Sequence, residues 1–508
     1  MPSLLSLSLS LLLLFNGCLA RQSSEQQFQF QNECQINRLN SIEPTSRIRS
    51  EAGTTEWWNP NSQQLRCAGV SVMRQNVEPN GLVLPYFTNA PQLIYIVQGR
   101  GIQGTVLPGC AETFQESQQG QEQGQKSRRR FQDQHQKIRR FRQGDMIALP
   151  AGVVHWFYND GNERLVTVNL LHTANSDNQL DNNPRRFSLA GNPEEEQRRL
   201  RRFAQQQIQG SRSESESEEM EDEDEEEQDN RPSRKQSGSR HEQQSSSCNN
   251  LLCAFDQEFL AQAFNVDTSL IRRLQEVRGH KGSIIRVRGR LDVVSPPTME
   301  EEEREERQQE QRYRQRHPSG RDNGLEETFC AMRLKENIAD PERADIFNPQ
   351  AGRLSTLNRY NLPILNALGL SAERGVLYNR AGTVPQWCIN AHKILYMLKG
   401  SARIQVVNEN GDTVFDDNVE QGQLLTVPQN FAFLKRAGSE GAEWVSFFTN
   451  SEAANTPLAG RVSAIRALPE EVVAASYQIS REDARKVKFN NQDTFFFTSS
   501  RSERRDQA

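Results

Sequence analysis

The segment QGDMIALPAGVVHWF, from Gln143 to Phe157, recurs later in the chain as QGQLLTVPQNFAFLK, from Gln421 to Lys435. Both copies keep glycine at the second position and proline at the eighth. Two further pairs of segments occur in the same order: NAPQLIYIVQG (89–99) with NAHKILYMLKG (390–400), and EFLAQAFNVDTSLIRRL (258–274) with EVVAASYQISREDARKV (471–487). Three matching blocks in one order predict two copies of one domain.

Each copy begins with short apolar segments that glycine, proline and asparagine separate, such as IYIVQG (94–99) and LVTVNLL (165–171). This pattern predicts a mainly β fold, an antiparallel sandwich or barrel. Each copy ends with a pair of short helices that have one apolar side. The apolar residues are Leu260, Phe264, Leu270 and Leu274 in the first copy, and Val472, Val473, Tyr477, Ala484 and Val487 in the second. Such a face must pack on its own barrel or on a neighbouring subunit.

The composition limits the function classes. The chain has 508 residues and a formal net charge of −5, which argues against a general nucleic-acid binder. Hydrophobic residues make up only 35%, while Gln, Glu, Asn and Arg are abundant. This composition fits solvated polar loops, and it also fits a reserve of nitrogen-rich side chains. Composition alone leaves both readings open.

The first 20 residues, MPSLLSLSLSLLLLFNGCLA, are typical of a secretory signal peptide, with cleavage expected between Ala20 and Arg21. The apolar segment is short for a membrane anchor, and no other segment is long enough to span a bilayer, so no membrane partner is expected. The mature chain would enter an oxidising compartment. Its cysteines are Cys34, Cys67, Cys110, Cys248, Cys253, Cys330 and Cys388. An odd number leaves at least one free thiol or an intermolecular bond.

Three polar inserts, at about 116–136, 194–247 and 299–323, are predicted to be disordered. The middle insert contains ESESEEMEDEDEEEQDN (214–230), a run of like charges that repels itself. Cation binding or a partner tail is the alternative interpretation of that run. A solvated loop is the simpler one.

The segment GDMIALPAGVVHWFYN has the spacing Gly-x5-Pro-x-Gly-x2-His-x3-Asn and resembles the second motif of the cupins. The motif residues are Gly144, Pro150, Gly152, His155 and Asn159. Metal-binding cupins supply His-x-His and Glu from the preceding motif, where this chain has Phe87, Thr88, Asn89 and Gln92. Since amides and Thr are poor substitutes for those ligands, the motif is interpreted as vestigial, with no metal or other cofactor. In the second copy Phe433 replaces the histidine.

The octamer NGLEETFC, from Asn323 to Cys330, follows a long polar stretch. Together with GLVLPYFTNAP (81–91) and LPILNALGLSAERGVLYNRA (362–381), it resembles the legumin-type (11S) seed storage globulins. That resemblance implies two tandem cupin (jelly-roll β-barrel) domains, at about 36–295 and 336–490, each followed by a small helical extension. It also implies that an asparaginyl endopeptidase cuts between Asn323 and Gly324, giving an acidic chain (21–323) and a basic chain (324–508).

The resemblance further implies disulfides Cys34–Cys67 and Cys110–Cys330, the second joining the two chains. It implies trimers before cleavage, hexamers after it, and deposition in the protein storage vacuole of seeds. The function expected is therefore a non-enzymatic nutrient reservoir, in a family with frequent food allergens. The alternative is a small-ligand-binding or metal-dependent cupin.

Overall fold

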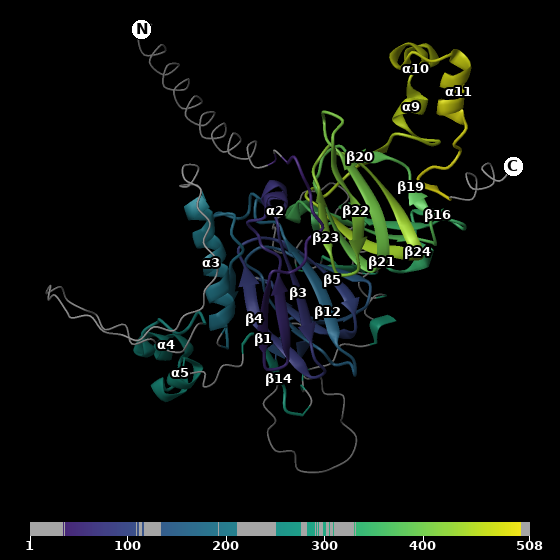
Figure 1. Cartoon of the computed structure of the whole chain (residues 1–508). Helices are drawn as coiled ribbons and strands as arrows, with labels where there is room; N and C mark the ends of the chain where they lie inside the picture. The colour runs from purple at the N-terminus through teal and green to yellow at the C-terminus, as the bar shows by residue number, and fades with distance from the viewer. Residues whose placement is uncertain are drawn as a thin grey trace, which may run out of the picture.

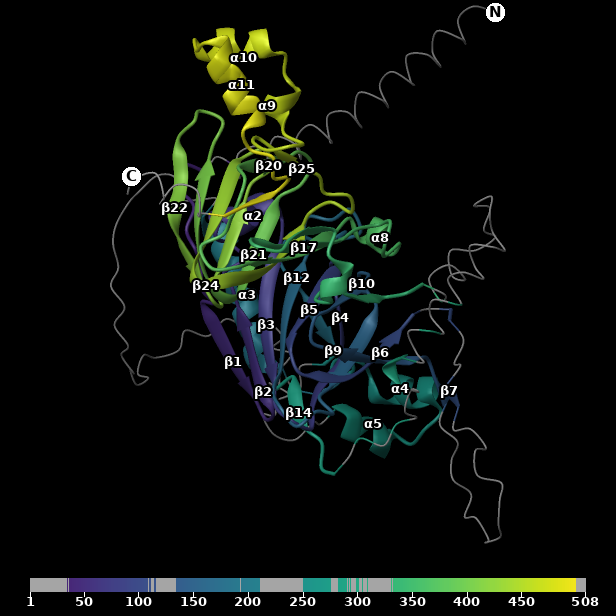
Figure 2. The same ribbon diagram turned by 90° about the vertical axis from the view of Figure 1, so that its right-hand side faces the viewer.

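The computed structural model describes part of the chain. The described residues are 34, 36–107, 109–110, 114–115, 134–191, 193–210, 250–275, 282–289, 291, 293, 298–300, 304, 308, 330 and 332–498. Two β-barrels lie side by side, and each has a helical extension (Figures 1 and 2). The predicted mainly β fold with two copies of one domain is confirmed.

Two sheets form the first barrel, with strand orders β1-β2-β3-β12-β5-β10-β15 and β13-β4-β11-β6-β9, and β14 pairs with β4. The strands are β1 (Ser46–Ser50), β2 (Gly53–Trp57), β3 (Ser71–Val77), β4 (Gly81–Thr88), β5 (Gln92–Gln98), β6 (Arg100–Val106), β9 (Ile138–Arg142), β10 (Asp145–Leu149), β11 (Val154–Tyr158), β12 (Leu165–Leu171), β13 (Arg186–Ser188), β14 (Ile284–Arg286) and β15 (Lys335–Asn337). A separate hairpin pairs β7 (Phe114–Gln115) with β8 (Gln134–His135). All strand pairs are antiparallel, as alternating apolar segments with short connections favour.

In the second barrel all strands belong to one continuous sheet, because two long strands take part in both of its layers. The strands are β16 (Ile346–Asn348), β17 (Gly352–Leu357), β18 (Ser371–Leu377), β19 (Gly382–Thr383), β20 (Gln386–Cys388), β21 (Lys393–Val407), β22 (Thr413–Glu420), β23 (Leu424–Val427), β24 (Ala432–Phe448), β25 (Asn455–Pro457) and β26 (Phe496–Phe497). Strand β21 corresponds to β5 plus β6 of the first barrel, and β24 corresponds to β11 plus β12.

A shared hydrophobic core joins the barrels. It contains Trp58 and Leu170 from the first barrel with Leu365 and Phe447 from the second, all fully buried. Two equivalent hydrogen bonds cross this interface. Arg74 Nη1 donates to Tyr396 Oη at 3.2 Å, and Arg374 Nε donates to Tyr95 Oη at 3.1 Å. Since Tyr95 and Tyr396 occupy the same place in the repeat, the two barrels face each other through matching surfaces.

The barrels also exchange short segments. Ile36 and Leu39 lie in the core of the second barrel, and Ile42 forms an isolated β-bridge with Leu424. Conversely, β15 pairs with β10 at the edge of the first barrel's seven-stranded sheet. Residues 36–42 therefore contact the second barrel, although they precede the first barrel in the chain. Backbone hydrogen bonding at an exposed sheet edge explains the exchange.

The helices of the described residues include α2 (Gln63–Ala68), α3 (Glu194–Gly210), α4 (Gln257–Phe264), α5 (Thr268–Gln275), α8 (Leu365–Leu368), α9 (Ala464–Ala467), α10 (Glu470–Tyr477), α11 (Arg481–Phe489) and a 3₁₀ turn η1 (Pro341–Arg343). The sequence predicted only the pairs α4–α5 and α10–α11, and α3 is the longest of the others. The insert predicted to be disordered from residue 194 thus begins as helix α3. Buried Leu200 and half-buried Phe203 of α3 pack on Ile48 and Trp57, and this tertiary packing stabilises the helix.

The other two inserts also need correction where they are described. The predicted insert 116–136 ends in strand β8, and Met299, Glu300, Arg304 and Gln308 within 299–323 are helical. The remaining residues of the inserts lie outside the described part.

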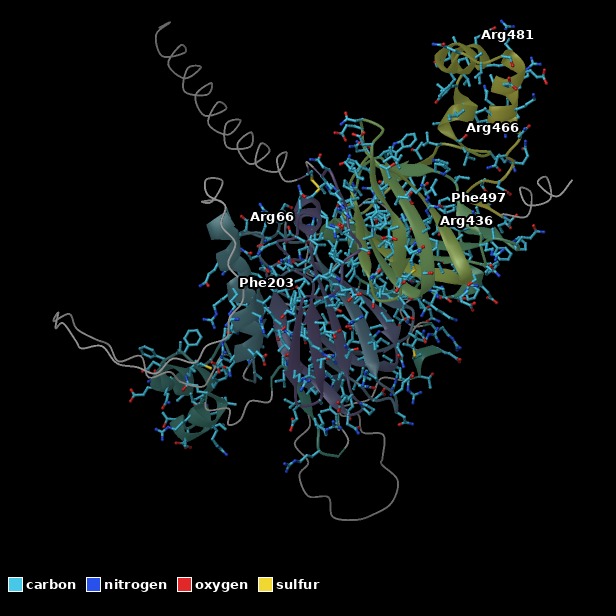
Figure 3. All side chains as sticks on the ribbon, viewed as in Figure 1. Arg66, Phe203, Arg436, Arg466, Arg481 and Phe497 are labelled. Atoms are coloured by element: carbon cyan, nitrogen blue, oxygen red, sulfur yellow. A yellow bond between two sulfur atoms is a disulfide. The ribbon has the colours of Figure 1, made fainter. Side chains whose placement is uncertain are left out.

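The two helical extensions lie at opposite ends of the molecule, as both views show (Figures 1 and 2). Helices α4 and α5 stand beside the first barrel, and α9 to α11 project from the second, where Arg481 points to solvent (Figure 3). The matching positions of these helix pairs confirm the third block of the repeat. Among the described helices, none is long and apolar enough to cross a membrane.

Candidate functional site

His155 of the cupin-like motif lies inside the first barrel on β11. It is fully buried, and its neighbours across the sheet are Thr105 on β6 and Tyr86 on β4. Its Nδ1 lies 2.9 Å from the Val153 carbonyl oxygen, and its Nε2 lies 3.1 Å from Gln92 Nε2. Since a carbonyl only accepts, Nδ1 carries the proton and Nε2 accepts from the Gln92 amide. Both ring nitrogens are thus occupied by protein partners.

The surroundings of His155 keep it neutral. Burial lowers its pKa to about 3, and Arg186 adds to the effect. The Tyr86 ring packs edge-on at 4.2 Å between ring centroids, and burial raises the pKa of Tyr86 to about 12. His155 is therefore an interior histidine with both ring nitrogens hydrogen-bonded, and it presents no free lone pair to a metal.

A buried ion pair that the sequence analysis missed lies next to this histidine. Arg186 Nη1 on β13 lies 3.0 Å from Glu196 Oε1 on α3, and both side chains are at most 3% exposed. The Arg186 guanidinium also stacks over Tyr86, 3.6 Å from the ring centroid. Because Glu196 lay in a segment predicted to be disordered, no sequence signal connected it with the barrel.

The remaining motif residues act in the backbone framework. The backbone N–H of Gly144 donates to Ile96 O, and that of Gly152 donates to Thr88 O, each at 2.9 Å. Asn159 is fully buried and donates from Nδ2 to the carbonyl oxygens of Val77 and Glu163. Pro150 follows directly after β10. These contacts close turns between strands and leave no polar group directed at a ligand.

The side chains that stand where metal-binding cupins have ligands are dispersed. Gln92 contacts His155 as described above. Thr88 Oγ1 donates to Ala90 O at 2.9 Å, and Asn89 Nδ2 contacts Asn178 and Asn183 at the barrel surface. Of these side chains only Gln92 is hydrogen-bonded to the histidine, so the described residues of the first barrel do not form the ligand set of a metal centre.

In the second barrel, Phe433 occupies the place of His155 and is surrounded by charge. Lys393 and Lys435 place their Nζ atoms 4.7 and 5.2 Å from the Phe433 ring centroid, and Lys393 forms an ion pair with Glu373. Lysine side chains stand there in place of imidazole and carboxylate ligands, so these described residues do not form a metal site.

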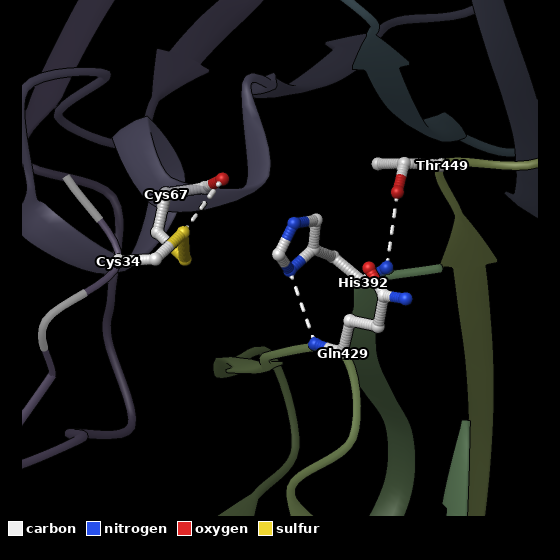
Figure 4. The surroundings of a disulfide bond; sticks show 5 residues. All are labelled: Cys34, Cys67, His392, Gln429 and Thr449. Carbon is white, nitrogen blue, oxygen red and sulfur yellow. Dashed lines mark hydrogen bonds between the residues drawn. A yellow bond between two sulfur atoms is a disulfide. The ribbon is translucent and has the colours of Figure 1, made fainter. Parts of the chain in front are cut away.

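One group of possible metal ligands in the described part of the chain comprises Cys34, Cys67 and His392, whose ligand atoms lie within 4.8 Å of one another (Figure 4). The two sulfur atoms form a disulfide with a Cα–Cα distance of 4.6 Å. Nδ1 of His392 accepts from the backbone N–H of Gln429 at 3.2 Å, which places the ring proton on Nε2. Neither thiolates nor a free imidazole lone pair is present, so the group is a disulfide packed against a histidine.

A second disulfide joins Cys110 to Cys330 across 220 residues of sequence. Both pairings are those that the resemblance implies. Cys253 is also disulfide-bonded, and Cys388 is a buried free thiol. The cleavage residues Asn323 and Gly324, and the signal-cleavage residues Ala20 and Arg21, lie outside the described part.

Comparisons with known proteins agree with this geometry. The cupin family model matches residues 39–195 and 336–485. The chain is 76% identical to Legumin A of Gossypium hirsutum, covering 100% of this chain and 99% of that protein. It is 56% identical to 11S globulin seed storage protein 1 of Carya illinoinensis, covering 99% of each. The structure of procruciferin, an 11S globulin from Brassica napus, superposes with a TM-score of 0.72 at 40% identity, covering 92% of this chain and 99% of that one.

These relationships extend over nearly the whole chain, and they agree with the two-barrel fold and the disulfides described above. The chain belongs to the cupin family and, within it, to the legumin-type (11S) seed storage globulins.

Proposed function

We propose that this protein is a nutrient reservoir of the seed, whose amide- and arginine-rich chain supplies nitrogen at germination, and that it has no enzymatic activity. The observation that supports this proposal most strongly is the state of the two barrel centres. One contains a histidine with both nitrogens occupied, and the other contains lysine side chains in place of metal ligands. Neither centre offers the open coordination that metal-dependent cupin chemistry needs.

Cleavage between Asn323 and Gly324 by an asparaginyl endopeptidase is part of this proposal. A long polar stretch precedes the bond, and such stretches admit a protease. The structure supports survival of the cut protein, because Cys330 is bonded to Cys110 and β15 pairs with β10. Transport through the secretory pathway to the storage vacuole follows from the expected signal peptide and the family.

The exposed helix faces support assembly into trimers. Phe259 and Phe264 on α4 are 73% and 53% exposed, and Tyr477 and Val487 on the opposite extension are 59% and 53% exposed. Exposure of such apolar surface to water is unfavourable, so we expect a neighbouring subunit to pack on it. An apolar face at each end of one chain allows head-to-tail contacts, and three such contacts give a trimer when they close a ring. Hexamers would then form from two cleaved trimers.

Gel electrophoresis of protein from its natural tissue, with and without reductant, tests the proposal. One band that splits on reduction, with the smaller chain beginning GLEETFC, is the expected result. A chain that stays intact on reduction excludes the processing. Stoichiometric metal in the same preparation would instead favour a metal-dependent cupin.

A further inference from the structure

Three charged side chains are enclosed at the centre of the second barrel. Glu373 on β18, Lys393 on β21 and Lys435 on β24 are each at most 1% exposed. Lys393 Nζ lies 2.5 Å from Glu373 Oε1, and Lys435 Nζ lies 4.0 Å from the same oxygen. Two ammonium groups thus share one carboxylate, and the group has a net charge of +1 when both lysines are protonated. An uncompensated buried charge is strongly unfavourable.

The position of this group in the barrel is that of the metal centre in metal-binding cupins. The repeat aligns Lys393 with Gln92 and Phe433 with His155. The strand register agrees, because Gln92 pairs with Leu171 and Lys393 pairs with Phe448, at the end of the corresponding strand. Protein ammonium groups therefore stand where related barrels hold a metal cation. A centre of this kind attracts an anion, whereas the centre of a metal-binding cupin attracts a cation.

Hydrogen-bond donors outnumber acceptors in this group. Glu373 Oε1 accepts from Trp444 Nε1 at 3.0 Å and from Ser446 Oγ at 3.3 Å, in addition to its ion pairs. Beyond the ion pairs, neither lysine Nζ has a hydrogen-bond partner. The amide of Gln386, fully buried on β20 and paired with Phe433 in the sheet, is also unpartnered. Glu373 Oε2 and Gln386 Oε1 are unpartnered acceptors in the same group. Two protonated lysines bring six N–H donors, so the donors remain in excess.

Aromatic rings supply part of the stabilisation. Lys435 Nζ lies 4.2 Å from the Trp444 ring centroid, and Lys393 Nζ lies 5.2 Å from that of Phe448. Cation–π contacts attract ammonium groups but leave the net charge unchanged. Cys388, the free thiol nearby, adds no negative charge, since burial raises its pKa. We propose that the centre of the second barrel binds one small monovalent anion, such as chloride, between Lys393, Lys435 and the Gln386 amide.

The enclosure selects the chemical class of the ligand. Glu373, Lys393, Lys435 and Gln386 are all buried, so only a small ion can be enclosed among them. A single negative charge matches the excess of the three side chains. Burial and the neighbouring Lys393 lower the pKa of Lys435. Anion binding opposes both effects, so binding is coupled to proton uptake and weakens as the pH rises.

Anomalous diffraction at the bromine edge tests the proposal. Crystals of the full chain are grown with bromide as the only halide. The expected result is one strong peak in contact with Nζ of both lysines. No peak at this place overturns the proposal and indicates that a neutral Lys435 amine removes the excess charge. This result depends on the wild-type chain alone.

Two variants distinguish a specific anion site from an adventitious ion. Lys435→Met removes one ammonium group and keeps a flexible apolar chain of similar length. Lys399→Met, at an exposed position on the same strand as Lys393, is the matched control. We expect the bromide peak to vanish in Lys435→Met and to persist in Lys399→Met. We also expect a rise in Tm on replacing gluconate by chloride at equal ionic strength, lost only in Lys435→Met. A peak that survives in Lys435→Met means an adventitious ion only.

Discussion

Lys335 pairs with Ile147 in the seven-stranded sheet of the first barrel, although the expected cleavage site at Asn323 lies between them in the chain. A strand that follows the expected cut thus completes a sheet formed by residues that precede it. In the other direction, Leu39 donates its backbone N–H to Val414 O at 2.8 Å in the second barrel. The two chains of a cut molecule therefore hold each other through backbone pairing and a shared core, independently of the disulfide.

This exchange leads to a prediction for Cys330→Ser. After cleavage at Asn323, the variant should keep both chains together in native size-exclusion chromatography. In denaturing gels without reductant its chains should separate, whereas those of the wild type separate only on reduction. Loss of the crosslink should also lower the free energy of unfolding of the uncut chain by about 2–4 kcal/mol. The control is Cys388→Ser, which removes only a free thiol. Dissociation of the variant in native buffer would show that the exchanged segments are insufficient.

Acidification should destabilise the protein through its buried histidines. Burial lowers the pKa of His155 to about 3, and those of His172 and His392 to about 4, from an ordinary value of 6.5. Below about pH 6.5 these histidines are protonated in the unfolded chain but stay neutral in the folded chain. Stability is thus highest above about pH 6.5 and falls as the pH drops toward the folded-state values.

His155 alone should account for a loss of about 2 kcal/mol between about pH 7.5 and pH 5. His155→Gln removes this titration, so its stability relative to the wild type should improve by that amount over the same range. Urea unfolding at the two pH values measures the difference. A stability difference between variant and wild type that is independent of pH would contradict the assignment of a neutral, enclosed imidazole.

The ion pair between Arg186 and Glu196 should matter far more than an exposed pair on the same helix. Glu196→Gln leaves the Arg186 charge buried without its partner, which should cost about 3–5 kcal/mol. Glu194→Gln breaks the pair with Arg198, whose side chains are 39% and 57% exposed, and should cost less than about 1 kcal/mol. Urea unfolding midpoints compare the two variants. Equal effects would mean that α3 does not depend on its anchor in the barrel.

Assembly should depend on the exposed apolar helix faces. Phe259→Glu places a charge on the face of α4 that we propose a neighbouring subunit covers, so the variant should sediment as a monomer. Leu180→Glu changes an apolar side chain that is 52% exposed in a loop, and it should sediment as the wild-type trimer. Analytical ultracentrifugation of the uncut proteins distinguishes these results. A trimeric Phe259→Glu variant would remove α4 from the proposed interface.

The sequence predicted the large features because they repeat. Three aligned blocks predicted two copies of one β domain, and the spacing of apolar residues predicted the helix pair at the end of each copy. Strand β15 could not be predicted, because the tripeptide KEN is polar and its pairing depends on an edge in the other barrel. Helix α3 was hidden by its charges, although Leu200 and Phe203, three residues apart, mark its apolar side. The charged centre had a signal, since Lys393, Leu395 and Met397 alternate on the inward face of β21.

Two glycines of the second barrel separate the cost of backbone conformation from the cost of crowding. Gly400, within β21, has φ +68°, and an added Cβ would lie 2.2 Å from Gly441 O. Gly411, in a turn, has φ +83° and nothing within 4 Å. Gly411→Ala should therefore cost about 1 kcal/mol through positive φ alone. Gly400→Ala adds a clash with backbone that cannot move without disturbing β24, so its unfolding midpoint in urea should fall clearly further. Similar midpoints for the two variants would show that the corner between the layers of the second barrel adapts to a side chain.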